Sequence, residues 1–469
     1  MSQRMLRCQI IGEGDERMSL TRRLAKAAVG GARFEPTPAA LAAAKASLID
    51  GVSVMLAATG LEPVVKPLEQ YARAQGGTPE AGFFGSGGVR LPAASAAMVN
   101  GGLSHALDFE DTFDAAGGHP NAISIPVLLA LGERVGASGA EVLTAIAIGG
   151  ELTCRLSLGL RHDPAERGWY HPPILGALGA VFGAARLLRL TPEETADSLS
   201  LAATGFALSA ELKRSPESTL RGIRDGLAAR AVVDAVSLGQ AGVRGFSLPL
   251  EGEAGVFRHL TGAAPDEDAI FDGVGEIWLN TSLSIKRWPT CRGTHAAMEI
   301  ARRMRSEGLR PDSVERIAVT VSSPDEMLMQ PLAQKRVPAT VIDAKFSIPF
   351  CAGMMLEHGD VSLGTFLDIT PPALASCFEY AGSFGGDSSL EGLTRFEVKL
   401  RDGTVRRYDQ KRPESDTTGT VSPAALRAKF DSCIIHARPV VTSQAADRLF
   451  EALLDFCNRP AGCLYDAID

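Results

Sequence analysis

The chain has 469 residues, and its 47 lysines and arginines against 55 aspartates and glutamates give a formal net charge of −8 at pH 7. With no sustained basic run, this balance excludes the electrostatic signature of a nucleic-acid-binding protein or of one held on an anionic membrane surface. The length predicts two or three units of domain size.

The N-terminal segment is charged and lacks an apolar signal region, and we expect no apolar run long enough to cross a bilayer. The eight cysteines form no C-x-x-C pair. In a chain of this size, that pattern is typical of reduced, mostly buried thiols rather than of disulfides or a structural zinc site. The sequence therefore predicts a cytoplasmic protein.

Residues 36 to about 260 have a helical pattern throughout. Thr37 and Pro38 predict the start of a long apolar helix that stops at Gly60. Two capping boxes predict further helix starts, Ser138 with Glu141 and Thr191 with Glu194. The apolar faces are rich in alanine and glycine, which favours closely packed helices.

The pattern changes after about residue 310. The segments "VERIAVTVSS" and "RFEVKLRDGTVRRY" alternate apolar and polar residues, so both predict strands, the second as a hairpin turning at Asp402 and Gly403. A polar linker at 411–423 precedes two more amphipathic helices. We therefore expect a mainly α protein, with a large all-helical domain from 1–281 and 416–469 and a smaller α+β domain from 282–415.

The stretch "SHALDFEDTFDAAGGHP", residues 104–120, concentrates histidines and acids. His105, Asp108 and Asp111 or Thr112 recur at three- and four-residue spacing, which would place them on one face of a continuing helix. Three interpretations stay open: a metal site, a solvated helix end, and a proton-transfer site formed by Asp108 and His119. The usual zinc signatures are absent, so we expect no metal.

Two further segments carry groups suited to anions. His171 precedes two prolines at a predicted helix start, where it would bind an anion or only cap the helix. Arg221 and Arg224 precede a predicted buried helix, so they fit carboxylate recognition as well as a solvated face.

The segment "KRWPTCRGTH" contains Lys286, Cys291, Arg292 and His295. Cys291 and His295 are spaced for a thiolate–imidazole pair, but no third orienting group is visible. Lys286 and Arg292 fit carboxylate binding better. The glycine-rich "GSGGVR" at 85–90 lacks the lysine and the strand-turn-helix context of a phosphate loop, so no nucleotide cofactor is expected.

Five ordered segments resemble motifs of the MmgE/PrpD family: "NGGLSHALDFEDT" continued by "HPNAISIPVLLALGE", then "HPPILGALGAVFGAARLLRLTPEETADSLSLAAT", "GLAARAVVDA", "KRWPTCRGTH" and "DAKFSIPF". The resemblance covers roughly residues 36–435. It implies a large helical domain, a smaller α+β lid, a cofactor-free site and a homodimer. It also implies proton transfer at a carbon next to a carboxylate of a small di- or tricarboxylate, as in dehydratases, decarboxylases and epimerases of this family.

The resemblance also implies site residues. The matching catalytic positions are Asp108, His119, His171 and Lys286, and Thr112 also matches. The expected substrate-binding residues are Thr112, Arg292 and four residues that depart from the family's pattern, Arg221, Arg224, Cys291 and Phe350. Arg221 stands where the family has a lysine and Arg224 where it has a histidine. Cys291 and Phe350 stand where the decarboxylase has histidine and tyrosine.

These departures bear on the reaction. Because arginine stays protonated, Arg221 and Arg224 are expected to bind carboxylates rather than to act as bases. We favour a hydro-lyase of the 2-methylcitrate dehydratase type. The alternatives are an epimerase or isomerase of a dicarboxylate and a non-catalytic carboxylate-binding protein.

Overall fold

The computed structural model describes residues 18–30, 34–205, 208–213, 215, 218–385, 388–413 and 417–468. The chain forms two compact units. The helical unit comprises Met1–Ile285 and Thr417–Asp469, and the mixed unit comprises Lys286–Asp416. Both parts of the chain flanking the mixed unit therefore belong to one helical unit. The chain is mainly α-helical with a small amount of sheet, as the sequence predicted.

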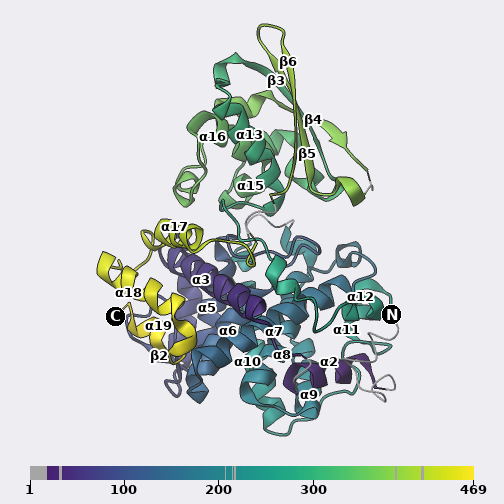
Figure 1. Ribbon diagram of the computed structural model, residues 1–469, viewed down its shortest axis with the longest axis vertical. Coiled ribbons are helices and arrows are strands. Elements are labelled where there is room, and N and C mark those ends of the chain that lie inside the picture. Colours follow the sequence, from purple (N-terminus) through teal and green to yellow (C-terminus); the bar gives the residue numbers. More distant parts are fainter. Residues whose placement is uncertain are drawn as a thin grey trace. The chain divides into compact units, whose positions relative to one another are not determined.

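In the helical unit the α-helices are α2 (Leu20–Val29), α3 (Pro38–Leu61), α4 (Val65–Gln75), α5 (Ala93–Ala106), α6 (Asn121–Val135), α7 (Gly139–Leu158), α8 (Pro172–Leu188), α9 (Pro192–Thr204), α10 (Leu220–Gln240), α11 (Val256–Thr261), α12 (Glu267–Phe271), α17 (Pro423–Ile434), α18 (Ser443–Leu454) and α19 (Cys463–Asp466). Short 3₁₀ segments are η2 (Pro164–Arg167), η3 (Ala210–Lys213), η4 (Leu279–Ser282) and η11 (Phe456–Asn458). The C-terminal helices α17 and α18 pack against α3, near the other end of the chain (Figure 1).

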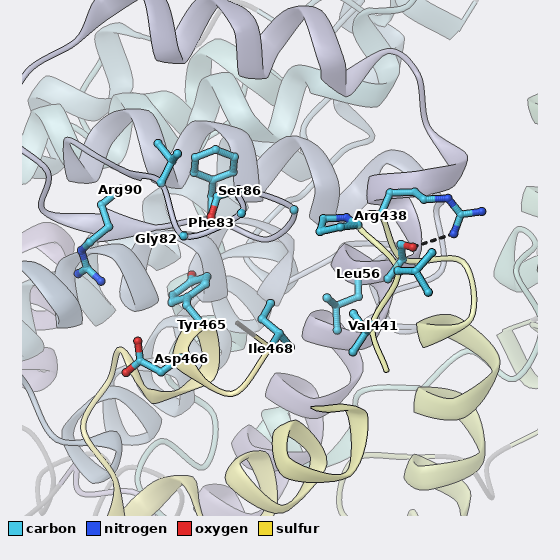
Figure 2. Close-up of a pocket in the computed structure, with 17 residues that line it drawn as sticks. Leu56, Gly82, Phe83, Ser86, Arg90, Arg438, Val441, Tyr465, Asp466 and Ile468 are labelled. Carbon is cyan, nitrogen blue, oxygen red and sulfur yellow. Dashed lines mark hydrogen bonds between the residues drawn. The ribbon is translucent and has the colours of Figure 1, made fainter. Parts of the chain in front are cut away.

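The expectation of an all-helical unit was wrong in one detail. Strands β1 (Ala81–Gly82) and β2 (Arg90–Leu91) form a small antiparallel pair. The predicted glycine-rich turn joins them, and Gly85, Gly87 and Gly88 all adopt positive φ. Figure 2 shows that this turn, with residues 437–441 and the C-terminal Tyr465, lines a hollow of about 130 Å³. None of the predicted site residues lines it.

The predicted helix starts are confirmed. The Thr37 hydroxyl accepts a hydrogen bond from the Ala40 amide at 3.2 Å, with Pro38 as the first helical residue. Both predicted capping boxes form, at the starts of α7 and α9. Each box satisfies amide groups that a helix start leaves without partners, which is why these sequence signals are local and readable.

The expectation that no apolar run is long enough to cross a membrane was wrong for α3. This helix has 24 residues and a mean hydropathy of 1.5 in its most apolar stretch, so by length and composition alone it could cross a membrane. However, 78% of that stretch is buried within the structure. The helix packs against α5, α7 and α17, which is the environment of a core helix.

Glycines let α5 and α10 approach closely. A Cβ on Gly226 of α10 would lie 2.2 Å from the Met98 carbonyl oxygen of α5, and one on Gly101 would lie 2.8 Å from the Gly226 Cα. Any side chain at these positions would push the helices apart. The contact brings the first turn of α10, which carries Arg221 and Arg224, beside the end of α5.

The mixed unit contains a four-stranded sheet in the order β4-β3-β5-β6. Its strands are β3 (Val314–Val321), β4 (Phe378–Ser383), β5 (Leu393–Leu400) and β6 (Val405–Lys411). The predicted strand at β3 and the predicted hairpin of β5 and β6 are confirmed, with Gly403 of the turn at φ +87°. Strand β4, which pairs with β3 in parallel, was not predicted.

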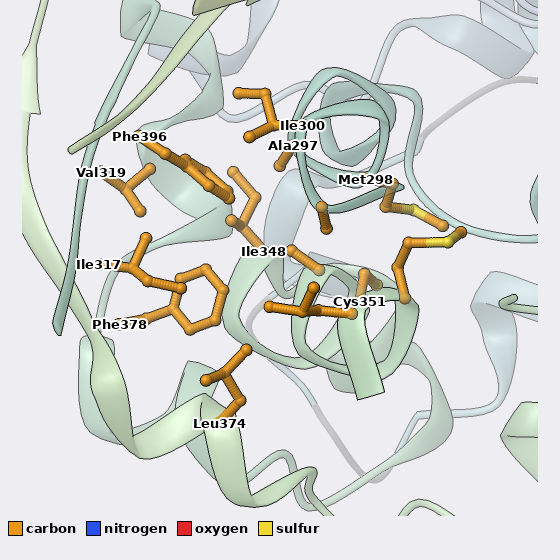
Figure 3. Packing of buried hydrophobic residues seen from close by; sticks show 14 of the residues in the cluster. Ala297, Met298, Ile300, Ile317, Val319, Ile348, Cys351, Leu374, Phe378 and Phe396 are labelled. Carbon is orange, nitrogen blue, oxygen red and sulfur yellow. The ribbon is translucent and has the colours of Figure 1, made fainter. Parts of the chain in front are cut away.

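Helices cover this sheet and form its core. They are α13 (His295–Ser306), α14 (Leu332–Arg336), α15 (Val341–Lys345) and α16 (Ile348–His358), with 3₁₀ segments η5 (Arg292–Thr294), η6 (Pro311–Ser313), η7 (Ser323–Leu328), η8 (Leu363–Leu367), η9 (Ala373–Cys377) and η10 (Ser388–Leu390). Figure 3 shows Ile317 and Val319 of β3 and Phe396 of β5 facing side chains of α13 and α16.

Candidate functional site

The stretch rich in histidine and acids does not continue α5 as a helix. The helix ends at Ala106, and Asp108 takes the left-handed conformation with φ +51°. The residues that follow form an irregular segment, which we call the acidic turn (residues 107–112), before α6 begins at Asn121. The predicted helical face was therefore wrong. A different geometry brings the side chains together.

Glu110 lies at the centre of this geometry. Its Oε1 atom lies 2.5 Å from Nδ1 of His105 and 2.9 Å from Nδ1 of His119. The rings of the two histidines meet edge to face, with centroids 4.8 Å apart. The side chains of His105 and Glu110 are buried, whereas that of His119 is 14% exposed. One carboxylate thus joins a buried histidine to one that solvent reaches.

Electrostatics set the protonation states of this group. Burial would raise the pKa of Glu110, but the charge and hydrogen bonds of His105 and His119 hold it well below its usual range. Burial lowers the pKa of His105, and the Arg224 charge adds to this effect against the opposing influence of Glu110. At neutral pH Glu110 is therefore a carboxylate and His105 a neutral ring.

An ionised carboxylate can only accept hydrogen bonds, so both histidines donate from Nδ1 to Glu110. The Nδ1 atom of His119 also lies 3.2 Å from the Asp111 carbonyl oxygen, a second acceptor. Nε2 is then the basic atom of each ring. In His105 it accepts a hydrogen bond from Arg224, and in His119 it lies 3.9 Å from Oδ1 of Asp108. The geometry leaves His119 Nε2 as the ring nitrogen that is not engaged with Glu110.

The two arginines of α10 take different places. Arg221 donates from Nη2 to Oδ2 of Asp108 at 3.3 Å, and its side chain is 21% exposed. Arg221 therefore presents a cation beside His119 through their shared neighbour Asp108. A guanidinium in this place can receive a substrate carboxylate.

Arg224 is enclosed. It is 1% exposed, and its guanidinium contacts His105, the Tyr170 hydroxyl at 3.2 Å and Asp225 at 3.2 Å. Its Cζ atom also lies 4.5 Å from the centre of the Tyr170 ring. These partners occupy the guanidinium and place Arg224 where it supports His105. The contact of Arg224 with substrate stays a prediction.

Thr112 and His171 border the cluster. Thr112 exchanges two backbone hydrogen bonds with Ser284, at 3.0 and 2.8 Å, which fixes the end of the acidic turn. His171 directly precedes α8, as predicted, and its neighbour Tyr170 is the residue that contacts Arg224. The start of α8 therefore lies beside the histidine cluster.

The four predicted positions Lys286, Cys291, Arg292 and Phe350 belong to the mixed unit. Arg292 contacts Nδ1 of His295 at 3.2 Å and donates to the Pro413 carbonyl at 2.6 Å. The Cys291 amide donates to the Lys345 carbonyl at 3.0 Å. Phe350 is wholly buried in the core of this unit, beside Phe366. Packing accounts for the position of Phe350, and its contact with substrate stays a prediction.

Four side chains of the acidic turn and its neighbours have the composition of a metal site. Among the described residues, His105, Asp108, Glu110 and His119 each offer one ligand atom, and these atoms all lie within 4.8 Å of one another. Two imidazoles and two carboxylates suit zinc. Both nitrogens of His105 already have partners, however, and two guanidiniums supply positive charge here. We interpret the cluster as a proton-transfer network.

Sequence reasoning missed Glu110 and Tyr170 and left His105 among open alternatives. Glu110 lies in a segment already dense in acids, so its type alone gave no reason to prefer it to Asp111 or Asp114. The useful signal was the two histidines themselves, because each imidazole needs a hydrogen-bond acceptor to fix its tautomer. Only the chain path shows which acid reaches both.

Comparison with known proteins places the chain in a family. The profile of the MmgE/PrpD N-terminal domain matches residues 22–268, and that of the MmgE/PrpD C-terminal domain matches residues 288–371. The cis-aconitate decarboxylase of Mus musculus is 26% identical over 69% of this chain and 66% of its own length. That of Homo sapiens is 25% identical over 63% of this chain and 62% of its own length.

A cis-aconitate decarboxylase-like protein of Aspergillus oryzae is 24% identical over 69% of this chain and 70% of its own length. The chain thus matches slightly less than two thirds of the length of the two mammalian relatives. The N-terminal profile alone spans more than half of the chain and includes the histidine cluster and both arginines of α10. The chain therefore belongs to the MmgE/PrpD family.

Proposed function

We propose that this protein is a cofactor-independent lyase that moves a proton at a carbon next to a carboxylate of a small di- or tricarboxylate. The observation that carries the proposal is that His119 Nδ1 faces two acceptors, the Glu110 carboxylate at 2.9 Å and the Asp111 carbonyl oxygen at 3.2 Å, because this leaves Nε2 of a partly exposed histidine as the basic atom. The names of the relatives, which are decarboxylases of a tricarboxylate, support the same substrate class.

The residues divide the work between binding and proton transfer. A substrate carboxylate binds to Arg221, whose charge is permanent, and the neighbouring carbon then lies near His119. His119 Nε2 removes the proton from that carbon, and Glu110 stabilises the imidazolium that forms. Negative charge moves onto the substrate carboxylate, where Arg221 stabilises it. Asp108 orients Arg221 and the imidazolium. The expected roles of His171 and Lys286 as further acid–base groups stay part of the proposal.

The fate of the carbanion distinguishes the reactions. Loss of a hydroxyl group from the adjacent carbon completes a dehydration, and we retain dehydration of a 2-methylcitrate-type substrate as the first candidate. Return of the proton to the opposite face would give an epimerisation. The second candidate is decarboxylation, in which the carbanion arises differently: the bond to a carboxylate breaks, carbon dioxide leaves, and the imidazolium form of His119 protonates the carbon that remains. The names of the relatives, which are cis-aconitate decarboxylases, favour it.

Proton NMR of a panel of di- and tricarboxylates in deuterated buffer tests the proposal. Product signals identify dehydration or decarboxylation, and isotope exchange without net conversion identifies epimerisation. His119→Gln should lose this exchange or turnover. His162→Gln is the matched control for that variant, because His162 is an exposed histidine of the same unit. If no acid in the panel exchanges or reacts with the wild-type protein, the family member only binds carboxylates and the proposal is wrong.

We also propose that the site works without a metal and that the protein is a cytoplasmic homodimer. Chelation should leave the rate unchanged; loss of activity that one divalent ion restores would identify the cluster of His105, Asp108, Glu110 and His119 as a metal centre. Light scattering at low micromolar concentration should give twice the mass of the 49.4 kDa chain. A monomeric mass would contradict the dimer.

A further inference from the structure

The C-terminal part of the chain contributes one side chain to the base of the acidic turn. Lys429 of α17 is separated from the turn by about 320 residues of sequence. Its Nζ atom lies 2.5 Å from Oδ1 of Asp50 on α3 and donates a hydrogen bond of 2.8 Å to the Phe109 carbonyl oxygen. It also lies 3.8 Å from the centre of the Phe109 ring. Three groups from two other segments thus surround one ammonium group.

This arrangement is buried. The side chain of Lys429 is 8% exposed and that of Asp50 is fully enclosed. Removing both charges from water is costly, and an apolar pair of similar size would stabilise a helix contact equally well. The ion pair therefore needs a reason beyond the packing of α17 on α3. The hydrogen bond to Phe109 supplies one, because no apolar side chain could make it.

Phe109 stands between the two residues that direct the site. Asp108 precedes it and contacts Arg221, and Glu110 follows it and binds both histidines. Asp108 has φ +51°, a backbone conformation that a residue with a side chain rarely adopts. Such a conformation persists where surrounding contacts impose it. The hydrogen bond from Lys429 to the Phe109 carbonyl oxygen is one such contact, because Phe109 directly follows Asp108.

We propose that Lys429 is a positioning residue for proton transfer, which fixes the acidic turn so that Asp108 and Glu110 hold Arg221 and His119 in their reactive places. The assignment rests on the proposed function for its kinetic consequence. Its structural consequence rests on the geometry alone: if Lys429 fixes the acidic turn, the Nδ1 protons of His105 and His119 stay in one position relative to Glu110. The site is thereby tied to the C-terminal helix α17 as well as to α5 and α10.

The test combines kinetics with histidine NMR. Lys429→Met keeps most of the length of the side chain but removes the charge and the donor. We expect kcat to fall by about 10²-fold, the scale of a small displacement of catalytic groups, with a much smaller change in KM. In protein labelled with ¹⁵N-histidine, the Nδ1 proton signals of His105 and His119 should shift or broaden. Lys429→Arg should restore part of kcat.

Arg427→Met is the matched control. Arg427 lies on the same helix, pairs with Asp431 and Asp447 at 2.8 and 2.7 Å, and stacks on Phe450. Its loss should leave kcat and both histidine signals unchanged. Equal losses in the two variants would assign Lys429 to helix stability and overturn the proposal. So would unchanged histidine signals in Lys429→Met or, if that variant does not fold because it leaves Asp50 charged and buried, in the double variant Lys429→Met/Asp50→Asn.

The NMR readout separates this proposal from the proposed function. If the wild-type protein converts none of the carboxylates, the proposed function fails, whereas shifted histidine signals in the Lys429 variants would still support the positioning of the acidic turn. If the wild type is active and Lys429→Met keeps full kcat and wild-type signals, only the role of Lys429 fails.

Discussion

Oε1 of Glu110 lies 2.9 Å from Nδ1 of His119, and this contact decides which nitrogen of the histidine is basic. Because Glu110 also accepts from His105, one buried carboxylate orients two rings. His105 in turn accepts a hydrogen bond from Arg224, whose guanidinium lies over the ring of Tyr170. The more exposed histidine of the cluster, His119, is therefore connected to a chain of buried contacts.

Replacing Glu110 with glutamine should impair proton transfer more than binding. The amide can donate to a ring nitrogen, so it favours the tautomer with the proton on Nε2 and removes the base. We expect Glu110→Gln to reduce kcat by between about 10² and 10⁴-fold, with little change in KM. Steady-state kinetics measures both constants. A variant with normal kcat would show that His119 does not depend on Glu110.

Arg221 should behave differently because its charge does not change during the reaction. Arg221→Gln should mainly raise KM, and Arg221→Lys should recover part of the affinity, since it keeps the charge but loses the bidentate geometry. Isothermal titration with an unreactive dicarboxylate measures binding directly. An Arg221→Gln variant that binds normally and turns over slowly would instead place Arg221 in the proton-transfer machinery.

Gly226→Ala should destabilise the helical unit. The added Cβ would lie 2.2 Å from the Met98 carbonyl oxygen, and backbone on both sides must shift to admit it. Overpacking of this kind costs about 1–3 kcal/mol. Urea denaturation measures the change. Gly30→Ala is the control, because its added Cβ would meet only ordinary contact at 3.4 Å. Equal stability of the two variants would contradict the close approach of α5 and α10.

The buried Asp50 makes the stability of the protein depend on pH. Burial raises the pKa of Asp50 from 3.8 to about 6, in spite of the opposing charge of Lys429. A raised pKa means that the folded state holds this proton more tightly than the unfolded state. The contribution to stability is complete below pH 3.8 and is lost as pH rises through about 6.

Asp50→Asn imitates the protonated form at every pH and removes this dependence. Relative to wild type, the variant should gain on the order of 3 kcal/mol in the free energy of unfolding between pH 4 and pH 7. Denaturation curves at several pH values give the difference. A difference that stays constant over this range would show that Asp50 does not change protonation there.

The parts of the fold that short segments encode were predictable. Capping boxes and the turn at Gly403 depend on neighbours within a few residues, and they were confirmed. The site was only partly predictable. Asp108 and His119 were singled out, but the helical spacing that grouped Asp108 with His105 does not exist, because α5 ends at Ala106.

The remaining residues are connected across long stretches of sequence. Lys429 reaches Phe109 from the far end of the chain, and Arg224 reaches His105 because glycines let two helices touch. No local pattern marks either contact. Residue type also does not show burial: Arg224 has the residue type of a carboxylate ligand, and only the structure shows that it is enclosed beside His105.

The measurement that tests the central claim most directly is deuterium exchange at the carbon next to the substrate carboxylate, followed by NMR in wild type and in His119→Gln. The claim is that His119 Nε2 takes this proton. Exchange in wild type should be slowed by about 10²–10⁴-fold in His119→Gln, with the affinity for substrate nearly unchanged. Exchange at the wild-type rate in His119→Gln would contradict the claim and transfer the role of base to another group, His171 or Lys286.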